Sequence, residues 1–520
     1  MRRSWWLVFV LGLLAACAPA GPAGPPEPSG GADDDLDQVI ATLRRVSPTT
    51  EGSVWQDTNG NLLPGDVDQW FLQTPRCWGT TDCPDPVGTD ELLRQISDTV
   101  ASAEVSVDIT TLWPYADGGW LDAVVDGLQR SSDAGHRPSV RWLAGSPFFF
   151  SYTGVGPDEF RADLVSRLGP VGQELPITVS TMTTALRSWN HAKIVAVDGR
   201  EAIVGGHNQW AASYLTATPV SDVSMKVRGP AAATATGFAD ILWGYVCDRE
   251  SEGFASLLWI RSSHSGPGAA CPRTSPVLSQ VRPGDMRILA VGRLGIDLAA
   301  PGVVAAQAPQ TVGLPLPEWI CPTFDGDATY EAANPGLVAA RALVASADEK
   351  VFISQQDLLS QCPRYDPTML RIITDQLARG VEVTIVVTGA FGTSYANMES
   401  LNDLSGQLYD VLRQRIPDPT EAQEVLCANL QLASLRIGDE PTWPDGAGFA
   451  NHAKFIHVDD QVFSVGSNNM YPASLQEFDL VVDDETAAQQ VRTAYLDPLW
   501  EWSKADAVID PDQGRCDIFG

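Results

Sequence analysis

One sequence element occurs twice in this chain, and this repeat limits the possible folds more than any other feature. Residues 190–208 and 451–469 align without a gap. The chain has only six histidines and five lysines, so its composition predicts about 0.06 His-x-Lys triplets by chance. The repeat therefore indicates two related halves, because self-similarity at a fixed spacing is typical of a repeated structural unit. The repeated positions are His191, Lys193, Asp198, Gly205 and Asn208, which recur as His452, Lys454, Asp459, Gly466 and Asn469.

The residues before each element predict the same order of helices and strands. In the first half, residues 91–103 carry apolar side chains at helical spacing, and residues 105–109 alternate like a strand. Residues 337–347 and 351–354 repeat this pattern in the second half. Alternating helices and strands indicate a layered α/β architecture. We expect two similar α/β/α sandwich lobes related by a pseudo-twofold axis, with the active site at their interface. Each half also shows a second strand, at 139–143 and 381–387.

Composition along the chain suggests five segments. Residues 1–17 read as a signal peptide, and residues 18–36 are rich in Pro, Gly, Ala and acidic residues, which is typical of a disordered tether. Residues 37–275 and 319–520 would form the two lobes. Residues 276–318 are rich in Pro, Ala and Gly with weak periodicity, and we expect a linker there.

The N-terminus predicts export. Arg2 and Arg3 precede an apolar run that is too short to span a membrane as a mature helix. Small residues before Cys17 resemble a bacterial lipobox, which would leave a lipid-anchored protein. Cleavage after Ala20 is the alternative and would release a secreted protein.

The cysteines agree with an exported protein. With Cys17 either lipidated or removed, eight of the nine cysteines are left to pair, and an even number in an exported chain favours disulfides. Pairing between neighbours along the chain is the simplest arrangement, for example Cys77 with Cys83. A zinc site is disfavoured because no CxxC spacing occurs.

Charge restricts the partners. The formal net charge is −31, so the surface repels nucleic-acid backbones unless a basic site is sunk in a cleft. Two of the scarce lysines, Lys193 and Lys454, nevertheless lie in the repeated element. A compact ammonium suits a tight pocket for one phosphoryl oxygen.

The repeated element itself points to phosphoryl chemistry. Alternation along a strand would place His191 and Lys193 on one face, and the same holds for His452 and Lys454. A pseudo-twofold axis would then gather two His, two Lys and two Asn around one point. Such a site suits a tetrahedral phosphate, with one His as nucleophile and the other as general acid.

The paired pattern His-x-Lys-x4-Asp-x6-Gly-(Gly/Ser)-x-Asn resembles the signature of the phospholipase D superfamily. Within it, the chain resembles the secreted, Streptomyces-type bacterial enzymes from about Asp37 to Cys516. Further stretches support this resemblance, namely 52–55, 71–75, 189–193, 220–223, 354–358 and 466–472.

The resemblance implies a role for each repeated position. His191 would attack phosphorus and form a phosphohistidine, and His452 would protonate the leaving alcohol and then activate water or an acceptor alcohol. No metal or other cofactor is implied, since two lysines supply the positive charge. The non-bridging oxygens would be bound by Lys193, Lys454, Asn208 and Asn469.

The resemblance also assigns the acidic residues. Asp222 and Glu477 lie where the family places the acids that orient each His. Asp is usual at the position of Glu477, which puts the reach of this carboxylate in question. Asp198 and Asp459 complete the catalytic signature, and we expect them mainly to hold the turn after the strand.

Four further residues are candidates for substrate binding. Trp210 and Tyr214 follow the first element, and Tyr395 lies in a Gly/Ser/Ala-rich segment of the second half. Faces of Trp and Tyr attract a quaternary ammonium, although core packing is an equally good interpretation of Trp210 and Tyr214. Ser467 follows Gly466, where the backbone leaves room for an anion.

These features predict a phospholipase D that cleaves the headgroup bond of glycerophospholipids, phosphatidylcholine above all, to phosphatidate. Exchange of the headgroup in the presence of an alcohol is expected as well. The expected partner is a phospholipid surface, without nucleic acid, and the expected state is a monomer. A nuclease or other phosphodiesterase of the same superfamily, and an inert lipid-binding lipoprotein, are the alternatives.

Overall fold

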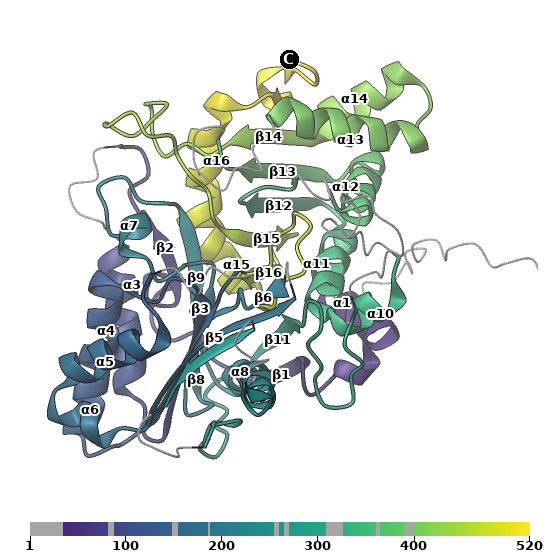
Figure 1. The fold of residues 1–520 in the computed structure, drawn as a ribbon. Helices are drawn as coiled ribbons and strands as arrows, with labels where there is room; N and C mark the ends of the chain where they lie inside the picture. The colour runs from purple at the N-terminus through teal and green to yellow at the C-terminus, as the bar shows by residue number, and fades with distance from the viewer. Residues whose placement is uncertain are drawn as a thin grey trace, which may run out of the picture. The chain divides into compact units, whose positions relative to one another are not determined.

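A computed structural model describes the chain over residues 35–81, 88–147, 154–185, 188–253, 259–264, 270–307, 326–359, 365–389 and 400–520. The described residues 35–520 form one compact unit. Their strands make two sheets, of nine and ten strands (Figure 1).

The strands of the first sheet come from the first half of the chain. Strand β6 (Ser188–Trp189) adds to β5 outside the main path. The order of the main path is β10 (Ile260–Ser263), β5 (Ile177–Ala185), β4 (Ser139–Gly145), β3 (Ser106–Leu112), β7 (Lys193–Val197), β8 (Glu201–Gly205), β9 (Asp222–Arg228) and β2 (Phe71–Thr74).

The second sheet has the same central order. Its path is β1 (Trp55–Asn61), β11 (Met286–Arg293), β17 (Glu477–Asp483), β16 (Val462–Gly466), β15 (Lys454–Val458), β12 (Lys350–Gln355), β13 (Glu382–Val387), β14 (Leu430–Ser434), β18 (Ile509–Asp510) and β19 (Arg515–Cys516). Strands β2-β9-β8-β7-β3-β4-β5 thus correspond one by one to β11-β17-β16-β15-β12-β13-β14. The predicted pair of similar α/β lobes is confirmed.

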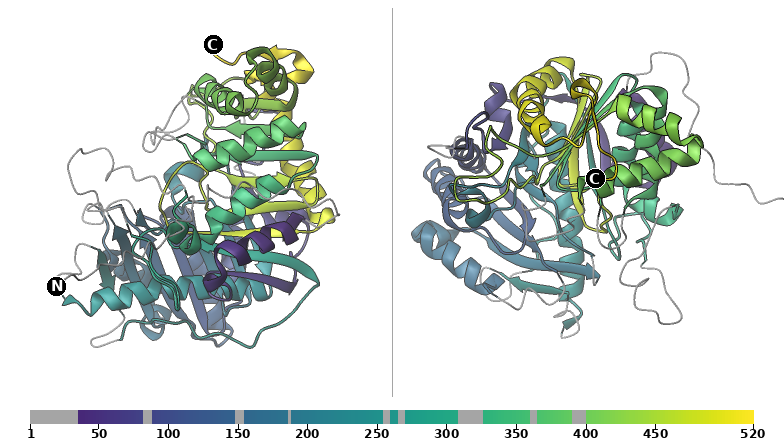
Figure 2. Two further views of the ribbon diagram at one scale, coloured as in Figure 1. Left: turned by 90° about the vertical axis from the view of Figure 1, so that its right-hand side faces the viewer. Right: turned by 90° about the horizontal axis from the view of Figure 1, so that it is seen from above.

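Helices cover the sheets in each lobe, as Figure 2 shows from two further sides, with green helices over the second sheet. The helices of the first lobe are α2 (Val67–Trp70), α3 (Thr89–Ala101), α4 (Gly118–Asp133), α5 (Pro157–Leu168), α6 (Pro170–Glu174), α7 (Ala211–Tyr214) and α8 (Pro230–Glu250). Those of the second lobe are α1 (Asp35–Val46), α10 (Ala328–Ala333), α11 (Pro335–Ser346), α12 (Pro367–Arg379), α13 (Leu401–Arg415), α14 (Pro419–Asn429), α15 (Glu485–Val491) and α16 (Asp497–Ser503).

Apolar periodicity explains the outer helices, and a buried helix joins the lobes. Leu92, Ile96 and Val100 recur on one face of α3 and are buried in the core of the first lobe. Helix α8 is apolar all round and packs against strands of both sheets. Its Phe238 ring lies 5.2 Å from that of Phe478 on β17. The core is therefore continuous between the two sheets.

Two segments depart from the predicted boundaries. Strand β11 lies inside residues 276–318, where a linker was expected, and pairs with β1 and β17. Its central residues are buried on both faces, so it lacks the alternation that marks a half-exposed strand. In addition, α1 and β1, which were expected in the first lobe, belong to the second: β1 pairs with β11 at the end of the second sheet, and α1 packs against α11. The second sheet therefore takes strands from both sides of the first lobe in sequence.

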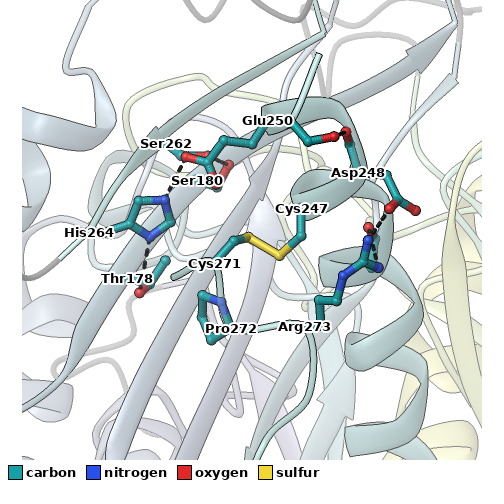
Figure 3. The surroundings of a disulfide bond; sticks show 12 residues. Thr178, Ser180, Cys247, Asp248, Glu250, Ser262, His264, Cys271, Pro272 and Arg273 are labelled. Atoms are coloured by element: carbon teal, nitrogen blue, oxygen red, sulfur yellow. Dashed lines mark hydrogen bonds and ion pairs between the residues drawn. A yellow bond between two sulfur atoms is a disulfide. The ribbon is translucent and has the colours of Figure 1, made fainter. Parts of the chain in front are cut away.

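Two disulfides lie in the described part of the chain. Cys247 at the end of α8 bonds Cys271, next to an ion pair of His264 with Glu250 (Figure 3). Cys427 bonds Cys516 and ties α14 to the C-terminal segment. Both bonds join neighbouring cysteines, which confirms that part of the predicted pairing. Within the described ranges, no helix is long and apolar enough to cross a membrane.

Candidate active site

The two repeated elements meet across the boundary between the lobes. The backbone N–H of His191 donates to the carbonyl of Gln476 at 2.7 Å, and that of His452 donates to the carbonyl of Ser221 at 2.7 Å. Each histidine therefore lies beside the start of a strand of the other lobe, β17 or β9. The histidines precede β7 and β15 instead of lying within them, which corrects the expected placement on the strands.

Each imidazole faces a carboxylate from the opposite lobe. His191 Nδ1 lies 3.2 Å from Glu477 Oε1, and His452 Nδ1 lies 2.7 Å from Asp222 Oδ2. Both carboxylates are fully buried. Glu477 thus contacts its histidine although Asp is usual at this position. Because each Nδ1 faces an acid, Nε2 is the nitrogen left to each ring for chemistry on a substrate.

The two lysines add positive charge at the same point. Lys193 Nζ donates to the carbonyl of His191 at 2.7 Å, and Lys454 Nζ donates to that of His452 at 2.5 Å. Burial lowers the pKa of Lys454 to about 8, against the favourable effect of Asp222. Burial, and then the charge of Lys454, holds the pKa of Lys193 well below its usual range. Two ammonium groups confined in this way favour an anion between them.

Burial and the neighbouring lysine charges oppose protonation of both histidines. Burial lowers the pKa of His452 to about 4, followed by the charge of Lys454, although Asp222 opposes the shift. Burial, Lys193 and Lys454 also hold the pKa of His191 well below its usual range. A bound phosphodiester would offset the lysine charges and so make protonation of one histidine easier.

Asn469 hydrogen-bonds its catalytic acid directly, whereas Asn208 is connected to its acid only through its backbone N–H and Tyr214. Asn469 donates to Glu477 Oε1 from its backbone N–H at 3.3 Å and from its side-chain amide at 3.2 Å. In the first lobe, the backbone N–H of Asn208 donates to the Tyr214 hydroxyl at 3.4 Å, which in turn donates to Asp222 at 2.7 Å. Tyr214 thus links Asn208 to Asp222 in the first lobe, whereas Asn469 contacts the longer Glu477 directly in the second.

Asp198 and Asp459 lie at the far ends of β7 and β15, away from the histidines. Asp198 accepts hydrogen bonds from the backbone N–H groups of residues 104–106, at 2.7 to 2.9 Å. Asp459 accepts three from residues 348–350 in the same way. Both have a left-handed backbone, with φ of 56° and 49°. Their contacts agree with the expected role in holding the turn and not with a role in catalysis.

Asp198→Ala should therefore lower stability and leave the chemistry nearly intact. The substitution leaves three backbone donors without their acceptor, which we expect to cost about 3 kcal/mol. Thermal unfolding should show a lower Tm, while kcat at a temperature below unfolding stays within about threefold of wild type. A loss of kcat with an unchanged Tm would contradict this role.

The candidate headgroup residues separate into three cases. Tyr214 is 1% exposed, and its ring packs against Trp120 and His207, so it lies behind Asp222 and not on a headgroup wall. Core packing, the second of the two interpretations given for Tyr214, describes this position. Trp210 is half-buried, and its indole N–H donates to the carbonyl of Pro114 at 2.9 Å. Tyr395 lies outside the described residues.

Ser467 is fully buried and belongs to the framework of the site. Its hydroxyl accepts from the N–H of Phe478 at 3.0 Å, and its own N–H donates to Asp479 at 2.8 Å. Neither group points to a substrate contact, in contrast to the expectation. Within the described ranges, no group of three or more His, Cys, Asp or Glu could hold a metal ion.

Sequence reasoning missed Arg293, which is buried at the end of β11 and donates to Glu477 Oε2 at 2.8 Å. Arg293 lies in the segment expected to be a linker. An arginine that ends an apolar run was the available signal, because a buried cation requires an acidic partner.

The chain is similar to known proteins in sequence and in fold. Residues 341–500 match the family described as "Cardiolipin synthase, PLD-like domain". The chain is 40% identical to "Phospholipase D" of Streptomyces antibioticus over 498 residues, which covers 91% of this chain and 88% of that protein. The fold resembles that of phosphatidylserine synthase from Haemophilus influenzae Rd KW20, with a TM-score of 0.51 at 12% identity, over 91% of this chain and 92% of that one.

The match to the Streptomyces protein covers 91% of this chain and therefore extends over both lobes. The repeated elements supply the two histidines that converge at the lobe boundary, each against a carboxylate of the other lobe. On this sequence evidence and this geometry, the chain belongs to the phospholipase D family.

Proposed function

We propose that the protein is a phospholipase D that cleaves the headgroup bond of glycerophospholipids, with phosphatidylcholine as the preferred class. The observation that carries this proposal is the crossed pair of acid and histidine, His191 with Glu477 and His452 with Asp222, beside two buried lysines. This arrangement supplies a nucleophile, a general acid and positive charge at one point, as a phosphodiester requires.

In the first step, Nε2 of His191 attacks phosphorus and the bond from phosphorus to the headgroup oxygen breaks. His452 donates a proton to that oxygen, and the headgroup alcohol leaves. Lys193 and Lys454 bind the non-bridging oxygens, where their positive charge stabilises the pentacoordinate transition state. The product of this step is a phosphatidyl group on His191.

In the second step, His452 takes a proton from water, and the water oxygen attacks phosphorus. The bond from phosphorus to His191 then breaks, which gives phosphatidate and restores both histidines. An alcohol that replaces water gives a phospholipid with a new headgroup. Asp222 supports both proton transfers, because its carboxylate favours the imidazolium form of His452.

The charge of the chain supports a lipid over a nucleic acid. With a net charge of −31, the protein repels a polyanionic strand, whereas a zwitterionic headgroup carries its own cation. Trp210 remains a candidate contact for that cation. We infer that the protein acts as a monomer on a membrane or micelle surface.

We infer further that the protein is exported and either released or anchored through Cys17. The disulfides Cys247–Cys271 and Cys427–Cys516 support this location, because such bonds persist in oxidising compartments. Mass spectrometry of the mature N-terminus would distinguish a diacylglycerol on Cys17 from a free terminus.

One assay tests the proposed activity. Phosphatidylcholine vesicles with ethanol, in the presence of EDTA, should yield choline, phosphatidate and phosphatidylethanol. Matched incubations with single-stranded and duplex DNA test the nuclease alternative. DNA cleavage without lipid turnover would overturn the proposal in favour of a nuclease. Vesicle binding without any product would favour a lipid-binding protein.

A further inference from the structure

The two halves of the site differ in charge although their backbones correspond. Strand β2 ends at Thr74, which pairs with Asp222, and β11 ends at Arg293, which pairs with Glu477. Thr74 and Arg293 are therefore equivalent positions behind the two acids. The Thr74 hydroxyl lies 2.9 Å from His207 Nε2, whereas Arg293 Nη1 donates to Glu477 itself at 2.8 Å.

Two further pairs of equivalent positions show the same difference, with neutral residues behind Asp222 and a charged residue behind Glu477. His207 and Ser224 of the first lobe correspond to Asn468 and Asp479 of the second. His207 Nδ1 lies 2.7 Å from the Ser224 hydroxyl, and burial lowers the pKa of His207 to about 4, so this group is neutral near pH 7. In the second lobe, Asp479 instead accepts from the backbone N–H of Asn468 at 3.0 Å. A neutral layer thus backs Asp222, and a charged layer backs Glu477.

Arg293 is the centre of the charged layer. Its side chain is almost fully buried and donates to Asn468 Oδ1 at 2.6 Å, to the carbonyl of Ala473 at 2.5 Å and to the Tyr330 hydroxyl at 3.2 Å. These contacts fix the guanidinium from two segments, the loop between β16 and β17 and helix α10. The carboxylate of Glu477 is consequently held between Arg293 on one side and His191 on the other.

Opposed protonation of the two histidines is what the proposed reaction needs. A nucleophile must present an unprotonated Nε2, whereas a general acid must hold a proton at the start of the step. A carboxylate whose charge is already offset by a buried guanidinium favours a neighbouring imidazolium less than a carboxylate without such a partner. The charged layer behind Glu477 therefore favours an unprotonated His191, the nucleophile, and the neutral layer behind Asp222 favours a protonated His452, the general acid.

We propose that Arg293 is a positioning residue that gives the two histidines their different roles, by fixing the Glu477 carboxylate against His191 and by offsetting its charge. The proposal rests on the proposed function for its catalytic meaning. It does not need the headgroup to be choline, because the asymmetry lies behind the histidines and away from the substrate.

Other charges also face the two rings and must be held constant in a test. Glu477, Lys193, Lys454 and His452 act on His191. Asp222, Tyr214, Lys454 and Lys193 act on His452. Substitution of Arg293 removes none of these groups, nor Asp479, which acts on both Glu477 and Arg293. A shift in the titration of His191 on its substitution therefore reports the loss of the guanidinium and of its hold on Glu477.

The test compares Arg293→Gln and Arg293→Lys with Arg287→Gln. Arg287 lies on the same strand and pairs with Asp57 near the surface, which makes it a matched control for loss of an arginine. In Arg293→Gln, the pair of His191 and Glu477 should bind its proton at a pH about one unit higher than in wild type. The acidic limb of kcat/KM for phosphatidylcholine should move up by the same amount. Arg293→Lys keeps the charge and should restore most of the position of this limb.

Histidine NMR reads the same shift without substrate. The chain has six histidines, so the imidazole 13C signals of His191 and His452 can be assigned with His191→Ala and His452→Ala. Unmoved titration of His191 in Arg293→Gln, or an equal change in Arg287→Gln, would overturn the role of Arg293. If Arg293→Gln does not fold, Arg293→Lys decides the question. A His191 titration identical to wild type together with a lowered kcat would support positioning by the guanidinium fork. The same titration with an unchanged kcat would overturn this role.

Failure of the proposed function gives a different result. Wild-type protein that does not cleave phosphatidylcholine contradicts the substrate, whereas the histidine titrations, measured on the free protein, still decide whether Arg293 separates the two rings.

Discussion

His191→Ala should abolish turnover, whereas His452→Ala should retain the first half of the reaction for a substrate with a good leaving group. The two histidines occupy nearly symmetric positions, yet only a nucleophile forms a bond to phosphorus. A phosphatidyl ester of p-nitrophenol needs no proton on the leaving oxygen, so loss of the general acid does not prevent its departure. Loss of the nucleophile prevents it completely.

The measurement is a burst of p-nitrophenol on mixing enzyme with excess ester. His452→Ala should release about one equivalent per active site and then stop, because no base remains to activate water. With phosphatidylcholine, the same variant should lose at least about 10³-fold in kcat, since general acid catalysis is worth about 10²–10⁴-fold in each step. His191→Ala should give neither a burst nor turnover with either substrate.

Mass spectrometry of the quenched His452→Ala enzyme should then locate the phosphatidyl group on a peptide that contains His191. His207→Ala is a useful control, because His207 is buried beside Asp222 but does not face the opposite lobe. A burst from His191→Ala, with the adduct on a peptide that contains His452, would reverse the assigned roles and would also contradict the role proposed for Arg293.

The duplicated element made the chemistry of this site predictable from the sequence. A His-x-Lys triplet that occurs twice in one frame specifies two lobes and one shared point, and the crossed acids Asp222 and Glu477 followed from the family resemblance. Helices such as α3 were also predictable from the sequence, because the apolar residues Leu92, Ile96 and Val100 recur at helical spacing and so lie on one face.

Residues behind the catalytic groups could not be predicted in this way. Tyr214 has the sequence context of a substrate contact, and only the packing of α7 against Trp120 and His207 shows that its hydroxyl serves Asp222. Arg293 lies far from both elements in sequence and reaches Glu477 through the pairing of β11 with β17. Pairing between distant strands depends on the whole fold, and local periodicity contains little information about it.

The second large expected effect is a dependence of kcat/KM on pH that comes from the two lysines. Both ammonium groups must be charged to bind the phosphate, and burial lowers the pKa of Lys454 to about 8 in the free protein. The charged form is therefore lost as the pH rises through about 8, so kcat/KM should fall on the basic side near that value. A bound phosphate favours the ammonium form, so the basic limb of kcat should lie at higher pH than that of kcat/KM, because kcat reports the enzyme with substrate bound.

Lys454→Arg and Lys454→Met separate charge from geometry. The guanidinium stays protonated throughout, so in Lys454→Arg the basic limb should differ from that of wild type and report Lys193 alone. It should also lower kcat by about 10²-fold or more, because the planar fork does not fit where Lys454 Nζ contacts the His452 carbonyl. Lys454→Met should lose about 10³-fold or more at every pH, since no cation remains to offset charge in the transition state.

Lys350→Met is the matched control, since Lys350 pairs with Asp460 at the start of β12, away from both histidines. Its pH profile should be that of wild type. A basic limb in Lys454→Arg that is identical to that of wild type would show that Lys454 does not control it. Lys193, whose pKa is lowered by burial and by the charge of Lys454, would then be the next residue to test.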